Sequence, residues 1–241
     1  MKSTVFYKIV VLLIVVLSGL SSARGQSLMS PSAHGMWGGS VFSGAGITAP
    51  QVGSGLSDMT GVMGIGFGNP YKNCGIQLST WINDVSEQKD FSLCLKFHRK
   101  FDPGSAIALG LNHFWVQKGV QVNDNYYAVI SHDFSYNFPD NKVLGSLAFS
   151  FGYGTGKFSN YGLSDQSFNN SGLFGTASYS ILKVLKWELE WDGFELNTGF
   201  KLSGRILKLP VGLMIGAADL TTKYSGKTRV IAAFGIGYDI W

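Results

Sequence analysis

The stretch WELEWDGFELNTGF, residues 187–200, decides the fold class of this chain. Large apolar residues alternate with polar ones on both sides of Asp192-Gly193. A period of two is typical of β-strands, and Asp-Gly between two such runs indicates a two-residue hairpin turn. That turn predicts Glu190 directly opposite Glu195 on one face of the hairpin. Two carboxylates in that position need a compensating cation or a shared proton, since like charges opposed in a sheet are destabilising.

The same alternation recurs along most of the chain, in segments of about ten residues separated by turn residues. The sequence predicts twelve strands at 37–48, 59–68, 73–84, 89–101, 104–117, 123–137, 142–154, 171–182, 184–192, 194–204, 208–218 and 228–240. The expected fold is therefore all-β, a closed antiparallel up-and-down transmembrane β-barrel of about 12 strands, and an even number is typical of bacterial barrels.

The composition also favours a wall that faces lipid. Of the 241 residues, 45% are hydrophobic and only 14% are charged, against about a quarter charged in an ordinary soluble domain. The bulky members of each alternating run are apolar, and the other members are mostly Gly, Ala and Ser. This arrangement fits an apolar exterior around a polar interior. The longest apolar run after residue 25, residues 210–218, is too short for a spanning helix.

Residues 1–25 have the layout of a secretory signal peptide, with Lys2 and Lys8 before the apolar run 9–17 and a small, polar end. The alternative, a transmembrane anchor, needs about 20 apolar residues. Cleavage after Ala23 or after Gly25 fits equally. We expect the mature barrel to span 26–241, with 16 basic and 15 acidic residues, so nucleic acid is not an expected partner.

The connections predict an orientation in the membrane. Asp102-Pro103-Gly104 and Pro139-Asp140-Asn141 are tight-turn sequences that fall on the periplasmic side if the chain starts there. The longest connection, residues 155–170, falls on the external side.

Charged residues on the interior face of the predicted strands are the candidate site. They are Lys96, His98, Glu188, Glu190, Glu195, Lys201 and Arg229. One interpretation is a constriction that attracts cations; the other is a network of internal salt bridges that stiffens the barrel. His98 fits a pH-sensing or anion-binding group or a hydrogen-bonded structural residue.

Aromatic residues at the strand ends predict membrane girdles. The candidates are Trp187, Trp191, Phe194, Tyr238 and Trp241. The last strand, 228–240, has to pair with 37–48 to close the sheet, because an open edge is not stable in lipid.

Other reactive residues do not assemble into a catalytic or metal site in the sequence. Cys74 and Cys94 fall on opposite faces and out of register, so we expect no disulfide. Strict alternation points His113 and His132 toward lipid, which indicates a bulge or a shifted strand within 104–137. Neighbouring residues of a strand point to opposite faces, so Ser131, His132 and Asp133 cannot act as a relay. We therefore expect no enzyme activity, no metal and no cofactor.

Four segments carry a resemblance to known proteins. GIGFGNPYKNCGIQLST (64–80), SLCLKFHRKFDPGSAIALGL (92–111), WDGFELNTGF (191–200) and the ending FGIGYDIW together resemble a group of short bacterial outer-membrane β-barrels of unassigned function. SLMSPSAHGMWGG near the start and the WDG segment are more loosely similar to YjbH-type barrels, which are linked to exopolysaccharide export. The resemblance implies an outer-membrane location and a role in passage or assembly at the envelope.

Two functional hypotheses follow. The first is a porin-like transport protein, a narrow channel for small solutes or ions that is either open or occluded. The second is a non-conducting structural or docking barrel that binds subunits of a secretion or exopolysaccharide-export complex. Both imply membrane lipid and the outer-membrane insertion machinery as partners.

Overall fold

The computed structural model describes residues 27–50, 58–84, 89–116, 125–163, 166–169, 172–206 and 209–240. The expected signal peptide, residues 1–25, and the girdle residue Trp241 lie outside the described residues. No helix within these ranges is long and apolar enough to cross a membrane.

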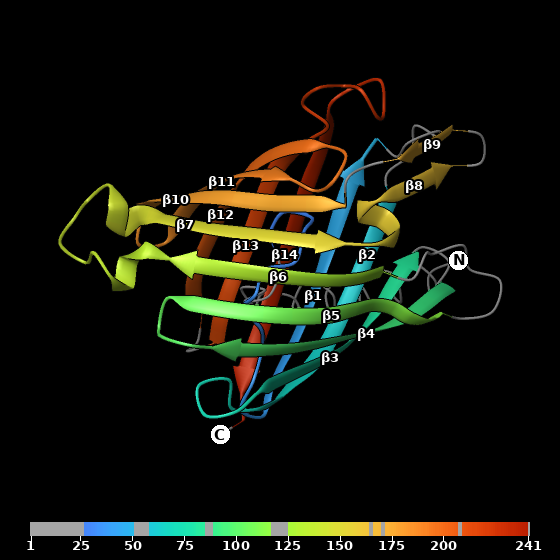
Figure 1. Cartoon of the computed structure of the whole chain (residues 1–241). Helices are drawn as coiled ribbons and strands as arrows, with labels where there is room; N and C mark the ends of the chain where they lie inside the picture. The colour runs from blue at the N-terminus through green and yellow to red at the C-terminus, as the bar shows by residue number, and fades with distance from the viewer. Residues whose placement is uncertain are drawn as a thin grey trace, which may run out of the picture.

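Twelve strands form one closed antiparallel barrel (Figure 1). In chain order they are β1 (Ser40–Ala49), β2 (Asp58–Gly68), β3 (Gly75–Asp84), β4 (Lys89–Lys100), β5 (Ser105–Val116), β6 (Asn125–Asp133), β7 (Leu147–Gly154), β10 (Leu173–Leu182), β11 (Leu185–Trp191), β12 (Leu196–Ile206), β13 (Leu209–Ala218) and β14 (Arg229–Asp239). Each strand pairs with its neighbours in this order, and β14 returns to β1. The fold class and the number of barrel strands predicted from alternation are confirmed.

β1 and β14 close the barrel as the sequence predicts. Their register runs from Ser40 opposite Asp239 to Ala49 opposite Val230. Gly44 faces Gly235 at the centre of this seam, where a Cβ on Gly44 would lie 2.9 Å from the carbonyl oxygen of Phe234. A small residue is therefore required at Gly44, in the centre of the seam that closes the barrel.

Two connections differ from the prediction. Strand β6 ends at Asp133 and β7 begins at Leu147, so Pro139-Asp140-Asn141 is part of a wider connection. That connection contains the 3₁₀ turns η1 (Phe134–Tyr136) and η2 (Leu144–Ser146). Asp133 ends its strand because its side chain accepts a hydrogen bond from the Ser135 N–H at 3.0 Å, which caps the 3₁₀ turn.

The connection at 155–170, predicted only as the longest one, has secondary structure of its own. It contains the 3₁₀ turn η3 (Gly156–Phe158) and a small hairpin of β8 (Asn160–Leu163) and β9 (Gln166–Asn169), which pair only with each other. Figure 1 shows this hairpin projecting from one end of the barrel. We call that end, which also carries the β11–β12 and β13–β14 connections, the loop end. The opposite end, with residues 69–74, 101–104 and 134–146, is the turn end.

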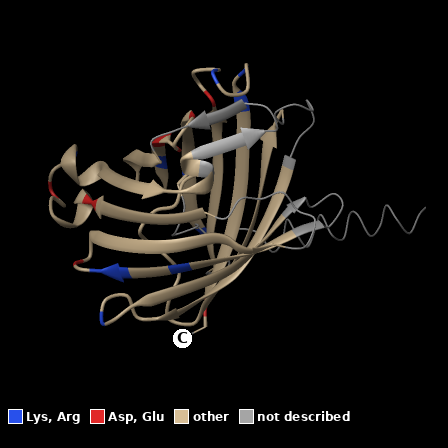
Figure 2. Ribbon diagram, turned by 45° about the vertical axis from the view of Figure 1, so that its right-hand side comes forward, with Lys and Arg blue, Asp and Glu red and all other residues tan. Residues whose placement is uncertain are grey.

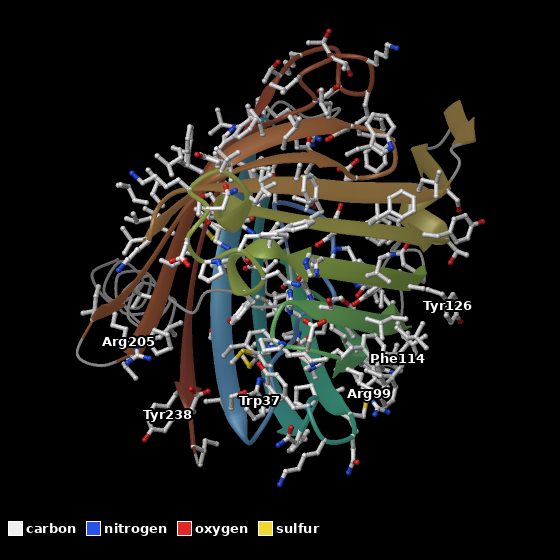
Figure 3. The ribbon with its side chains drawn as sticks, turned by 60° about the vertical axis from the view of Figure 1, so that its left-hand side comes forward. Trp37, Arg99, Phe114, Tyr126, Arg205 and Tyr238 are labelled. Atoms are coloured by element: carbon white, nitrogen blue, oxygen red, sulfur yellow. The ribbon has the colours of Figure 1, made fainter. Side chains whose placement is uncertain are left out.

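The two faces of the wall differ as alternation predicts. In β6 the side chains of Asn125, Tyr127, Val129 and Ser131 are buried inside, while Tyr126 and Ile130 are exposed outside. Large apolar side chains are exposed around the barrel, among them Met63, Phe67, Leu109, Trp115, Ile130, Phe151, Phe200 and Ile215. Figure 2 shows charged residues mainly at strand ends and in connections, and Figure 3 shows Tyr126, Arg205 and Tyr238 projecting away from the ribbon.

Candidate functional site: the lumen and its N-terminal segment

The interior of the barrel holds an N-terminal segment of the same chain. We call residues Ser27–Gly39 the plug. Its side chains are enclosed: Leu28 is 3% exposed, Ala33 is not exposed and Met36 is 7% exposed. The plug contacts β2, β3, β4, β6, β11 and β12, strands that lie all around the wall. The sequence carries no alternation or turn pattern that predicts this element.

Three lumen side chains accept hydrogen bonds from main-chain N–H groups of the plug. The carboxylate of Glu190 on β11 accepts from Met29 at 2.8 Å and from Ser30 at 3.1 Å. Farther along, the Ser131 hydroxyl on β6 accepts from Ala33 at 2.8 Å. Near the turn end, Gln77 Oε1 on β3 accepts from the Met36 N–H at 3.0 Å.

Two further side chains, both on β4, bind plug carbonyl groups. Lys96 Nζ donates to the carbonyl oxygens of Ser32 at 3.1 Å and His34 at 3.2 Å. His98 Nε2 lies 3.0 Å from the carbonyl oxygen of Met36 and must donate there, because a carbonyl can only accept. Lys96 and His98 were expected to line the lumen, and the structure places both there, against the plug.

Glycines make room for this arrangement at the turn end. A Cβ on Gly35 would lie 2.6 Å from His98 Cδ2, and a Cβ on Gly75 of β3 would lie 2.4 Å from His98 Cε1. The His98 ring is therefore held between the plug and the wall, with 1% of its surface exposed. These contacts fix the depth at which the plug crosses the lumen.

The β11–β12 connection differs from the predicted two-residue hairpin. Trp191 pairs with Leu196 and Glu190 pairs with Asn197, so the turn contains four residues, 192–195, and Glu190 does not face Glu195. The Asp192 carboxylate causes this, because it accepts hydrogen bonds from the N–H of Glu195 at 2.9 Å and from Asn197 Nδ2 at 3.0 Å. The offset is two residues, so the interior and exterior faces are those that alternation predicts.

Each interior carboxylate has its own partner at the loop end. Glu195, which is fully buried, forms an ion pair with Arg229 of β14. Glu188 lies 3.0 Å from Lys201 Nζ across the β11–β12 pair. Glu190 is bound by the plug, and Asn197 Nδ2 lies 3.4 Å from its Oε1. The residues predicted to line the lumen thus face inward and are joined into pairs or to the plug.

Asn197 and Asp219 connect this network to the β13–β14 connection and were missed by the sequence analysis. Asn197 Oδ1 accepts from the Asp219 N–H at 3.0 Å. Burial acts to raise the pKa of the Asp219 carboxyl, but hydrogen bonds from Ser225, Tyr224 and Thr221 outweigh it and hold the pKa below its usual value. A lone Asn in an alternating strand gives no signal of such a role, because its partner is 22 residues away.

An apolar cluster fills the lumen beside the plug. It consists of Ala33 of the plug, Ala106 and Ala108 of β5, Tyr127 and Val129 of β6, Phe158 of η3 and Phe174 of β10. The rings of Phe158 and Phe174 stack at a centroid distance of 4.4 Å. Phe158 is fully buried, so the connection after β7 folds into the loop end of the lumen rather than away from it.

The described girdle candidates divide between the two ends. Trp191 is 41% exposed at the loop end of β11, where Phe194 in the adjoining turn is half-buried and packs against Tyr224 at a centroid distance of 4.9 Å. Trp187, on the same strand, is 37% exposed, and Tyr238 is 55% exposed at the turn end. Arg99 is also exposed, as expected for a residue that faces outward at the membrane boundary.

The histidines that alternation points to lipid have different positions. At His113 a bulge in β5, with φ of 56°, turns the ring toward Ser92, whose Oγ lies 2.6 Å from His113 Nδ1. This is the bulge that the sequence indicated. His132 stays on the outer face and lies 2.8 Å from Ser105 Oγ. Cys74 and Cys94 form no disulfide with each other, as predicted.

The Ser131-His132-Asp133 run does not converge in the structure. Ser131 and His132 lie on opposite faces of β6, and the Ser131 hydroxyl is bound to the plug and to Ser150. Asp133 accepts from Ser135 rather than joining a relay. Within the described ranges no group of three His, Cys, Asp or Glu residues could hold a metal ion.

Comparisons with known proteins assign no family to the chain. No protein-family model matches it, and no curated protein matches it. Among solved structures, it is similar to outer membrane phospholipase A from Escherichia coli, with 10% identity, a TM-score of 0.42 and coverage of 84% of this chain and 94% of that one. It is similar to the translocator domain of autotransporter NalP from Neisseria meningitidis, with 12% identity, a TM-score of 0.41 and coverage of 83% and 88%.

A mutant of the Rhodopseudomonas blastica porin is similar at 9% identity and a TM-score of 0.36, over 74% of this chain. The match covers 55% of the porin, so it spans only about half of that protein. Identities and TM-scores as low as these do not assign a function to this chain.

Closure and exterior chemistry assign the location. A closed antiparallel barrel satisfies its backbone hydrogen bonds between strands, and the exposed apolar side chains of this one match a hydrocarbon environment. The protein is an outer-membrane β-barrel whose lumen is occupied by its own N-terminal segment.

Proposed function

We propose that the protein is a channel for small solutes or ions that its plug holds closed. A twelve-stranded barrel encloses more space than the eight strands that side chains just fill. Here residues 27–39 take up that extra space. The supporting observation is that polar lumen side chains bind the plug by hydrogen bonds to its main chain, contacts that water can replace when the segment leaves.

Planar-bilayer recording tests this proposal with two forms of the chain. The full chain is expected to be closed or to open only briefly. A variant that lacks residues 28–36 but keeps Trp37-Gly38-Gly39 before β1 is expected to give steady conductance steps. Insertion is checked by the shift in gel migration on boiling. A deletion variant that is folded and inserted yet silent would contradict the channel.

A second candidate is the non-conducting structural or docking barrel. The filled lumen favours it, because the plug and the Phe158 cluster leave a packed interior. The loose similarity to YjbH-type barrels makes an exopolysaccharide-export complex one setting for this role. A stoichiometric partner recovered in mild detergent, together with a silent deletion variant, would support this candidate over the channel.

Neither candidate includes catalysis. We propose that the Ser92–His113 and Ser105–His132 pairs are structural, because each joins neighbouring strands of the wall. Loss of lipid or ester hydrolysis on mutation of either serine would contradict this.

A further inference from the structure

The lumen side chains recognise the plug by its main chain. Seven hydrogen bonds described above join them, four to N–H groups and three to carbonyl oxygens. They involve main-chain groups at six positions between Met29 and Met36. Pro31 has no N–H, and it is a position at which the wall accepts no hydrogen bond from the plug. Main-chain groups are common to all peptides, so these contacts do not depend on the sequence of the plug.

The charges of the wall also give the site a direction. Glu190 accepts hydrogen bonds from two successive N–H groups near the amino-terminal end of the plug. Lys96 and His98, which donate to carbonyl oxygens, lie toward its carboxyl-terminal side. A free peptide has a cationic amino end and an anionic carboxyl end. It therefore matches this wall when it lies in the same direction as the plug.

We propose that the lumen is a binding site for the main chain of a peptide, and that the solutes of the open channel are oligopeptides about as long as Met29–Met36. This inference rests on the proposed channel function. The plug is then a tethered competitor, which occupies the positions that a free peptide takes when the segment is displaced. Side-chain preference comes only from size, since Gly35 passes His98 at close range and Ala33 is enclosed in the apolar cluster.

The test uses the open deletion variant and a synthetic octapeptide with the sequence of residues 29–36. The peptide is expected to cause discrete, concentration-dependent closures of the channel. A matched peptide that carries a methyl group on the amide nitrogen of its second residue, Ser30, keeps every side chain but loses the hydrogen that Glu190 accepts there. Its blocking concentration should be on the order of tenfold higher. A neutral oligosaccharide of similar length should not block.

Variants of the wall give a second readout. Lys96→Met and Glu190→Gln in the deletion background should each weaken the block on the order of tenfold. Lys142→Met and Asp140→Asn, which change exposed residues of the 134–146 connection, are the matched controls and should leave it unchanged.

The outcomes separate the two proposals. If the deletion variant is inserted but silent, the channel is wrong. If it conducts and neither peptide blocks, or both block equally, the channel stands and main-chain recognition is wrong. If the deletion variant does not insert, Gly35→Val in the full chain replaces it. That substitution places a side chain against His98 and should displace the plug while leaving all five binding side chains in place. The same peptide comparison then decides.

Discussion

Lys96 Nζ lies 3.1 Å from the carbonyl oxygen of Ser32, so a wall cation and a plug carbonyl are in direct contact inside the barrel. The same ammonium group also binds the His34 carbonyl at 3.2 Å. Lys96 is 5% exposed, and a buried ammonium group requires such partners. The plug therefore supplies the hydrogen-bond acceptors that the buried Lys96 requires, and Lys96 in turn holds the plug in place.

We expect Lys96→Met to open the full-length channel. The substitution removes two charge-assisted hydrogen bonds, each worth about 1.5–3 kcal/mol. Since 1.4 kcal/mol is a factor of ten, the open fraction should rise at least about tenfold. Single-channel recording measures it directly. Lys142→Met is the control, because Lys142 is exposed in a connection. An unchanged open fraction in an inserted Lys96→Met protein would show that these contacts do not hold the plug.

Breaking the Glu195–Arg229 pair should destabilise the barrel more than any other single ion pair described here. Both residues are buried, and removal of one partner leaves a buried charge, which typically costs about 3–5 kcal/mol. Arg229→Ala should therefore lower the temperature at which the folded gel band is lost. The comparison is Lys186→Ala, which removes a 3.9 Å contact with Asp133 made by a side chain that is 42% exposed. Such a pair is worth at most about 1 kcal/mol. Equal shifts for the two variants would contradict the prediction.

The strands could be predicted because each carries its own signal. In β7 the alternation of Phe149, Phe151 and Tyr153 with small residues depends only on adjacent residues, so it can be read without knowledge of the tertiary structure. It also gave the correct face for Glu190 although the turn was wrong, since an offset of two residues keeps the face.

The plug could not be predicted in this way. Its partners lie far away in the sequence: Ala33 and Ser131 are 98 residues apart, and Met29 and Glu190 are 161 apart. Its bonds also use main-chain groups, which every residue has. The same limit explains the β11–β12 turn, because Asp192-Gly193 matches a two-residue hairpin until Asn197 is known to bind the Asp192 carboxylate. Interior charges predicted a polar lumen, but nothing local indicated that the chain itself fills it.

We expect Gly110→Ala to destabilise the barrel by about 1–3 kcal/mol, the usual range for overpacking. A Cβ on Gly110 would lie 2.0 Å from Cζ of the Tyr127 ring on the neighbouring strand. A second substitution, Tyr127→Leu, should cost less in the Gly110→Ala background than in the wild type, because it removes the collision. Gly204→Ala is the control, since its Cβ would meet only Val211 Cγ2 at 3.8 Å. Denaturant titration in detergent measures all four. Strict additivity of the two changes would exclude the collision.

The β13–β14 connection should loosen at acid pH because of Asp219. Its carboxylate oxygens accept from Thr221, Tyr224 and Ser225, and these bonds hold its pKa below the ordinary value of 3.8 despite its burial. A depressed pKa means that the carboxylate stabilises the folded loop above about pH 4, and that this contribution is lost as the pH falls through the folded pKa. Hydrogen exchange at the amides of Tyr224 and Ser225, corrected for intrinsic rates, should show protection at pH 6 that is lost as the pH falls through the lowered pKa of Asp219. Asp219→Asn should lose the protection already at pH 6, because the neutral side chain cannot make the same charge-assisted bonds. Protection that is equal in both proteins at every pH would mean that the main chain alone holds this loop and that the Asp219 carboxylate does not stabilise it.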